Sequence, residues 1–280
     1  WLFRSITPEI GKTLPTYQGE LMLTEHSAGS ISSQAYMKRW NRKNEFLADA
    51  AERASLAAWW LGARDYPSQK LEDAWYLVLG SQMHDILPGT SLPTAYEYSW
   101  NDEVIAAGQF STIIEDASGA VISAMDTSAK GTAVVVYNPL SIARQDVVEA
   151  SVPSLAGAAG GAKSVKVTAP DGSSVPAQIL GVDGLKTRVA FLAPVGSVSY
   201  GVFDVQLSTD APAAGSLKVS ESQLENEYFV VKLDGNGDVC SVYDKQAKRE
   251  TLSAPMTLSL NYENPRNWPA WNQDWADRQL

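Results

Sequence analysis

The first half of the sequence places apolar residues three and four positions apart, the spacing of a helix that buries one face. Residues 33–61 predict a long helix that ends at Gly62, because glycine is frequent just beyond the last helical turn. Residues 68–84 predict a second helix, closed by Pro88, and residues 93–117 predict a third. Three long helices with short connections indicate a helical bundle.

The spacing also predicts which side chains enter the core of this bundle. In the third helix the apolar stripe passes through Val104 and Ala107. Four large aromatic residues fall on the helical stripes and are therefore expected to be buried, namely Trp59, Trp60, Trp75 and Trp100.

From about residue 130 the pattern changes to short runs rich in β-branched residues, several of which alternate apolar and polar positions. These runs lie at residues 132–137, 147–148, 164–168 and 185–191. Turn sequences rich in Asn, Asp, Gly and Pro separate them. The pattern is typical of an antiparallel β-sandwich.

A second sheet-based unit is predicted beyond residues 208–216, whose Ala, Ser and Pro content is typical of a linker. Runs at residues 228–233 and 239–243 flank a turn at residues 234–237, and a further strand is predicted at residues 256–260. The predicted fold class is therefore α+β multidomain, with a three-helix bundle followed by antiparallel β-sandwich domains.

Composition narrows the range of partners. The chain has 280 residues, 45% of them hydrophobic, which is enough apolar material for several folded domains. Its formal net charge of -10 argues against nucleic acid as a partner, because the protein would repel a phosphate backbone. No run approaches the roughly 20 apolar residues of a membrane-spanning helix, so no membrane span is expected.

The supply of metal-binding side chains is small. The chain has one cysteine, Cys240, and two histidines, His26 and His84, which excludes a histidine-rich or cysteine-rich metal site. Any metal site must be rich in carboxylates or completed by other polypeptide. The first residues lack both a methionine and the order of a secretory signal, so we expect an internal piece of a longer protein.

One candidate site is the pair His84 and Asp85, at the expected end of the second helix. A neutral imidazole there could bind zinc while the carboxylate accepts hydrogen bonds from a sugar. Alternatively, His84 caps the last helical carbonyls and Asp85 caps the next segment. The local pattern alone favours capping, because one histidine beside one aspartate is not a metal-binding signature.

A second candidate lies at residues 19–25, where alternation predicts a strand that ends at His26. Polar side chains at the end of a strand are common in binding crevices. The pattern alone favours the alternative, in which His26 is solvated and Ser30 or Ser32 caps the next helix. Glu20, Glu25 and Asp85 are the only carboxylates near both candidates, and none is compelling as a glycosidase nucleophile.

The tryptophans near the end of the chain, Trp268, Trp271 and Trp275, lie in a loop-like segment. Sugar stacking is one interpretation, and packing against other polypeptide is the favoured one.

Five motifs, in order along the chain, resemble those of bacterial-type α-mannosidases of glycoside hydrolase family 38. They are LPTYQGEL with His26 and SQA (14–35), QMHDILPGTS (82–91), YNPLS (137–141), LENE with SVYDK (224–245) and NPRNWPAW (264–271). The resemblance implies a zinc-dependent, retaining exo-α-mannosidase that hydrolyses terminal α-mannosides of oligosaccharides or glycans. It assigns His84 as a zinc ligand, Asp85 as a hydrogen-bond partner of the mannose hydroxyls, and His26 as a residue near the sugar.

The resemblance also implies how the chain is divided. Residues 1–30 would be the end of the catalytic α/β-barrel domain, 31–125 the three-helix bundle, 130–210 a β-sandwich and 217–280 the start of a second, truncated β-sandwich. The nucleophile, the acid–base residue and the other zinc ligands would belong to a missing N-terminal catalytic segment, so the isolated chain should not catalyse. The alternatives are a non-catalytic carbohydrate-binding or structural module and a related glycosidase for another sugar.

Overall fold

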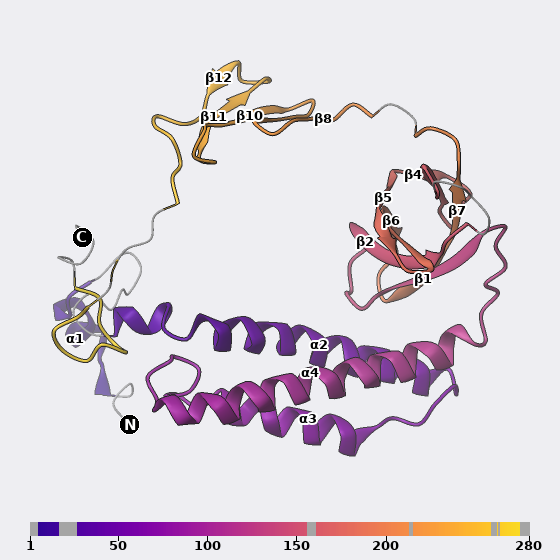
Figure 1. Cartoon of the computed structure of the whole chain (residues 1–280). Helices are drawn as coiled ribbons and strands as arrows, with labels where there is room; N and C mark the ends of the chain where they lie inside the picture. Colours follow the sequence, from indigo (N-terminus) through magenta and orange to yellow (C-terminus); the bar gives the residue numbers. More distant parts are fainter. Residues whose placement is uncertain are drawn as a thin grey trace.

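The chain forms helices first and β-sheets afterwards, as the sequence predicts (Figure 1). The structure is a computed structural model, and it describes residues 5–16, 27–155, 161–212, 215–258, 262 and 264–274. The strand predicted at residues 19–25 lies outside these described residues.

Three long helices run side by side and form the predicted bundle: α2 (Ala35–Trp60), α3 (Ser68–Ser81) and α4 (Pro93–Ile122) (Figure 1). A short helix, α1 (Pro8–Thr13), and a 3-10 turn, η2 (Ala28–Ile31), precede them. Gly62 ends α2 as predicted, because its φ of +69° is a left-handed conformation that favours glycine. Pro93 occupies the first turn of α4, where its missing N–H is not needed.

Small side chains let the helices of the bundle approach closely. The core contains Ala48 and Ala51 of α2, Leu71, Ala74 and Val78 of α3, and Ala106, Phe110 and Ile113 of α4. Trp75 packs against this core as predicted, with its ring edge-on to that of Phe110 at a centroid distance of 5.8 Å.

The prediction that Trp59 and Trp60 are buried is wrong, because these side chains are 51% and 79% exposed. Successive helical residues point about 100° apart, so the two residues that follow the buried Ala58 face away from the bundle. Trp100 is also on the surface, at 39% exposure, with its ring edge-on to Tyr36 at 5.3 Å.

The predicted apolar stripe of α4 is right at Ala107, which is buried, and wrong at Val104. Val104 is 48% exposed, whereas Glu103 is fully buried. A carboxylate enters the core because Asn44 of α2 donates to it, through Nδ2 to Oε2 at 2.5 Å. Apolar periodicity could not predict a buried polar pair.

Two antiparallel sheets pack face to face after the bundle and confirm the predicted sandwich. Their orders are β1-β7-β3-β4 and β2-β6-β5. The strands are β1 (Thr132–Asn138), β2 (Arg144–Pro153), β3 (Ser164–Thr168), β4 (Ser174–Val175), β5 (Ala177–Asp183), β6 (Lys186–Val195) and β7 (Ser199–Ser208). Phe191 of one sheet meets Phe203 of the other at a centroid distance of 5.1 Å in the core.

A third antiparallel sheet follows, in the order β12-β11-β10-β9-β8 (Figure 1). Its strands are β8 (Lys218–Val219), β9 (Gln223–Glu225), β10 (Phe229–Leu233), β11 (Val239–Asp244) and β12 (Arg249–Glu250). The predicted turn joins β10 to β11, with Gly237 at a φ of +86°. Of the strand predicted at residues 256–260, the described part contributes a single bridge from Met256 to Val239.

The bundle contacts the sandwich through two stacked tyrosines. Tyr137 of β1 lies opposite Tyr200 of β7, and their rings stack at 4.6 Å with an interplanar angle of 21°. The pair packs against the small side chains at one end of the bundle, which are Ala54, Ala58, Ala117 and Val121. Within the described residues, no helix combines the length and apolar character needed to cross a bilayer.

Candidate functional site

The candidate site lies on the turn that joins α3 to α4. Helix α3 ends at Ser81, three residues before the predicted end, and residues 82–90 form a series of tight turns. The backbone N–H groups of Gln82 and Met83 donate to the carbonyls of Val78 and Gly80, at 3.0 and 3.3 Å. Backbone N–H groups therefore satisfy these two carbonyls, and the contact of the His84 side chain is with Asp85.

His84 and Asp85 lie in contact on this turn. Nε2 of the imidazole is 3.2 Å from Oδ2 of the carboxylate, and the His84 side chain is 84% exposed whereas that of Asp85 is 33% exposed. Oδ1 of Asp85 accepts a hydrogen bond from the Thr90 hydroxyl at 3.2 Å. When Nε2–H donates to Asp85, Nδ1 of His84 keeps its lone pair and can bind a metal ion.

Tyr96 of α4 fixes the backbone of the same turn. Its hydroxyl donates to the carbonyl of Asp85 at 3.1 Å and accepts from the N–H of Ser91 at 2.8 Å. Burial, and to a lesser degree the charge of Asp85, raises the pKa of Tyr96, so this hydroxyl remains a donor at neutral pH.

Gln82 connects the start of the turn to α2. Its amide Nε2 donates to Oδ1 of Asn41 at 2.8 Å, and Nδ2 of Asn41 donates to Oε1 of Glu45 at 3.1 Å. Glu45 in turn pairs with Arg42 at 2.7 Å. Spacing along the sequence does not predict this connection, because it cannot distinguish hydrogen-bonded polar residues of α2 from solvated ones.

Lys38 and Gly89 connect the end of the turn to the residues before α2. The Lys38 ammonium donates to the carbonyls of Ser33, Leu87 and Pro88 at 2.5, 3.0 and 3.1 Å. Gly89 has a φ of +89°, and a Cβ there would lie 2.6 Å from the Ser33 carbonyl oxygen. Glycine is therefore required both by the conformation and by the close approach.

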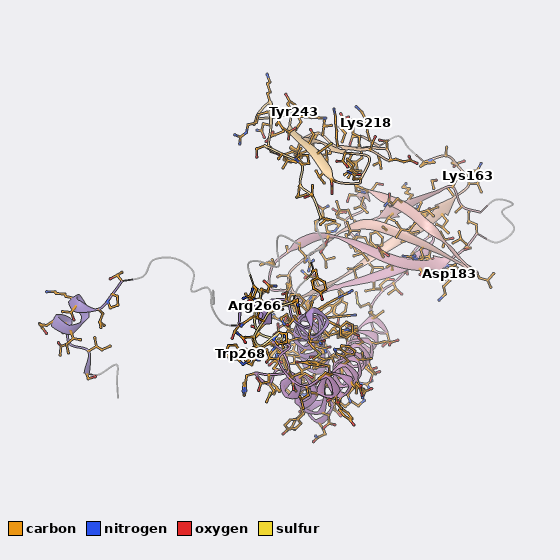
Figure 2. The ribbon with its side chains drawn as sticks, turned by 60° about the vertical axis from the view of Figure 1, so that its left-hand side comes forward. Lys163, Asp183, Lys218, Tyr243, Arg266 and Trp268 are labelled. Atoms are coloured by element: carbon orange, nitrogen blue, oxygen red, sulfur yellow. The ribbon has the colours of Figure 1, made fainter. Side chains whose placement is uncertain are left out.

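The segment at residues 264–274 packs against residues 27–33, and Figure 2 shows Arg266 and Trp268 beside the helical part of the chain. The Gly29 N–H donates to the Trp271 carbonyl at 2.7 Å, and the Ser33 hydroxyl donates to the Ala270 carbonyl at 3.0 Å. These contacts join residues that are more than 230 positions apart, so local sequence patterns could not predict them.

The tail tryptophans are only partly packed. Within this chain Trp268 is 61% exposed and Trp271 is half-buried. Trp275 lies outside the described residues.

The structure thus brings His84 and Asp85 together, while Glu20, Glu25 and His26 lie outside the described residues. In the part of the chain that is described, no three His, Cys, Asp or Glu side chains converge in a way that could hold a metal ion. An exposed imidazole beside a carboxylate fits the donor chemistry of zinc, which normally takes four ligands. The residues present therefore fit part of a zinc site.

Residues 25–119, which contain α2, α3, the His84 turn and most of α4, match the family described as the alpha mannosidase middle domain. Residues 25–119 are therefore similar to the middle domain of α-mannosidases. The resemblance inferred from the motifs is confirmed for this middle domain.

Two relatives match different lengths of the chain. Across 278 residues the chain is 28% identical to Alpha-mannosidase 2C1 of Mus musculus, which covers 97% of this chain and 24% of that protein. It is 34% identical over 90 residues to an Alpha-mannosidase of Saccharomyces cerevisiae, covering 31% of this chain and 8% of that protein. The chain therefore spans about a quarter of Alpha-mannosidase 2C1.

A solved structure shares the fold around the middle domain. The crystal structure of an alpha-mannosidase from Enterococcus faecalis V583 superposes with a TM-score of 0.63 at 22% identity. The match covers 86% of this chain and 32% of that chain, which shows a shared fold over most of this chain.

Proposed function

We propose that this chain is part of a zinc-dependent, retaining α-mannosidase that hydrolyses terminal α-mannosides of oligosaccharides or glycans. The match of residues 25–119 to the middle domain supports the enzyme class. The observation that carries the proposal is the exposed His84 imidazole, 3.2 Å from the Asp85 carboxylate, on a turn inside that domain.

In this proposal His84 is a zinc ligand, and Asp85 binds the hydroxyls of the mannose. Bound zinc would supply Lewis-acid stabilisation of charge on the sugar oxygens. The Asp85 carboxylate orients the imidazole through one oxygen and is itself held by Thr90 through the other. His26, which lies outside the described residues, is proposed as a further residue near the sugar.

The remaining machinery is proposed to lie in an N-terminal catalytic segment of the full-length protein. A retaining glycosidase needs a nucleophile and an acid–base carboxylate, and neither is identified among the described residues. We therefore propose that residues 1–30 end the catalytic barrel, 31–125 form the bundle, 130–210 form the first sandwich and 217–280 begin the second.

The test is a chromogenic α-mannoside assay of the full-length protein, combined with measurement of its zinc content. We expect His84→Ala to abolish zinc retention and to lower kcat/KM by at least about 100-fold, because loss of a ligand opens the metal site. Tyr76→Phe is the control, because Tyr76 is 64% exposed on the preceding helix. Zinc content and activity that persist after His84→Ala would contradict the assignment.

A second candidate function is carbohydrate binding without catalysis, which the 61% exposure of the Trp268 side chain favours. Titration of the 280-residue chain with mannose and with an α-mannoside tests this function. Binding that Trp268→Ala abolishes would support it, and absence of binding at millimolar sugar would leave the chain a structural part of the enzyme.

A further inference from the structure

The Lys38 ammonium donates hydrogen bonds to backbone carbonyls of two separate segments. It lies in the first turn of α2 and donates to the carbonyls of Ser33, Leu87 and Pro88, at 2.5, 3.0 and 3.1 Å. A lysine ammonium has three N–H donors, so these three carbonyls match its capacity. The Ser33 carbonyl precedes α2, whereas the other two belong to the His84 turn.

These contacts close a chain of connections through the middle domain. The segment at residues 264–274 holds Ser33, since the Ser33 hydroxyl donates to the Ala270 carbonyl at 3.0 Å. The Lys38 ammonium then joins the Ser33 carbonyl to a carbonyl of the His84 turn. Because Gly89 has no side chain, this turn also lies directly against Ser33.

His84 needs this support because its own side chain is 84% exposed and is not fixed by packing. Its position depends on the backbone that carries it, and a metal ligand must be placed to within a few tenths of an ångström. Tyr96 and Gln82 hold the middle and the start of the turn, and Lys38 holds its end.

We infer that Lys38 is a positioning residue, which holds the His84 turn against the residues before α2 and so places the His84 imidazole for metal binding. This inference rests on the proposed function of His84. On the His84 turn, the Lys38 ammonium binds the backbone carbonyls of Leu87 and Pro88. Its effect on the His84 and Asp85 side chains therefore passes through the backbone.

The test compares Lys38→Met with Lys43→Met in the full-length protein. The first change keeps the unbranched stem and removes all three donors. The second is a matched control, because Lys43 lies on the same helix and its exposed ammonium is 4.6 Å from the Trp40 ring centroid. Amide hydrogen exchange is measured in residues 82–90 and in the bundle core around Phe110.

In Lys38→Met we expect the amides of Gly89 and Thr90 to exchange about tenfold faster, and those around Phe110 to exchange at the wild-type rate. Lys43→Met should leave both regions unchanged. Wild-type exchange at residues 82–90 would overturn the inference. So would an equal acceleration around Phe110, because Lys38 would then support the bundle as a whole.

Zinc affinity, measured by competition with a chelator, gives the second readout. We expect it to weaken about tenfold in Lys38→Met, with a parallel fall in kcat/KM, and wild-type affinity despite local loosening would overturn the inference. If the wild-type protein neither binds zinc nor hydrolyses α-mannosides, the proposed function fails. The exchange comparison would still decide whether Lys38 holds the turn, so the two failures are distinguishable.

Discussion

Asn44 on α2 and Glu103 on α4 form a buried polar pair that joins the two longest helices. Both side chains are fully buried, and Nδ2 of Asn44 donates to Oε2 of Glu103 at 2.5 Å and to its backbone carbonyl at 2.9 Å. Burial raises the pKa of Glu103, and the charges of Asp102 and Glu45 act in the same direction, while the hydrogen bond from Asn44 opposes them.

The stability of the bundle should therefore depend on pH through Glu103. A carboxyl whose folded-state pKa lies above its ordinary value of 4.5 contributes its full stability below that value and loses it as pH rises through the folded-state pKa. We expect the free energy of unfolding of the wild-type protein to fall, relative to that of Glu103→Gln, as pH rises from about 4 to 8.

Denaturant unfolding at several pH values measures this difference. Glu97→Gln is the control, because Glu97 is exposed on the same helix, and its curve should stay parallel to that of the wild-type protein. A constant difference between the wild-type protein and Glu103→Gln across this range would contradict the prediction.

Gly89→Ala should disrupt the candidate site. The added methyl group would lie 2.6 Å from the Ser33 carbonyl oxygen, at a backbone φ of +89° that alanine adopts with strain. We expect a loss of about 1–3 kcal/mol in the free energy of unfolding, together with weaker zinc binding in the full-length protein.

Gly80→Ala is the matched control for this change. Gly80 lies in the last turn of α3, where nothing is within 4 Å of an added Cβ. Alanine should be neutral there or stabilise the helix by up to about 1 kcal/mol. Equal stability and equal zinc affinity in the two variants would show that the contact between Gly89 and Ser33 is unimportant.

Tyr137→Phe should preserve or increase stability at the contact between the bundle and the sandwich. The Tyr137 hydroxyl is buried, and it has no hydrogen-bond partner among the described residues. Burial raises the pKa of Tyr137 to about 12, so its hydroxyl is neutral at physiological pH. The buried hydroxyl cannot form a hydrogen bond with water, which costs stability. Phenylalanine keeps the stack on Tyr200 and removes this unpaired group.

Thermal unfolding measures the effect, which we expect to lie between zero and a gain of about 1–2 kcal/mol. Tyr200→Phe is the comparison, because the Tyr200 hydroxyl is 3.5 Å from the Ser118 hydroxyl and its loss should not stabilise the protein. A loss of more than about 1 kcal/mol in Tyr137→Phe would mean that the hydroxyl is paired in solution.

Much of the local structure follows from the sequence because short-range effects decide it. Gly62 ends α2 and the turn at residues 234–237 joins two strands, since glycine adopts left-handed backbone conformations that other residues avoid. The spacing of apolar residues predicts the three helices, and alternation predicts several strands of the sandwich. The sequence also identifies the pair His84 and Asp85 as a candidate site, because the two residues are adjacent in the chain.

The elements, their order and the candidate pair thus follow from local patterns in the amino-acid sequence. The tertiary structure decided which helix faces are buried: Glu103 is buried and Trp60 is exposed because packing partners, rather than spacing, set the environment of each side chain. It also decided how the His84 turn is held, since Lys38, Ser33 and the segment at residues 264–274 meet only after folding. Hydrogen bonds between distant backbone groups leave no periodic trace in a sequence, because a carbonyl is present at every position.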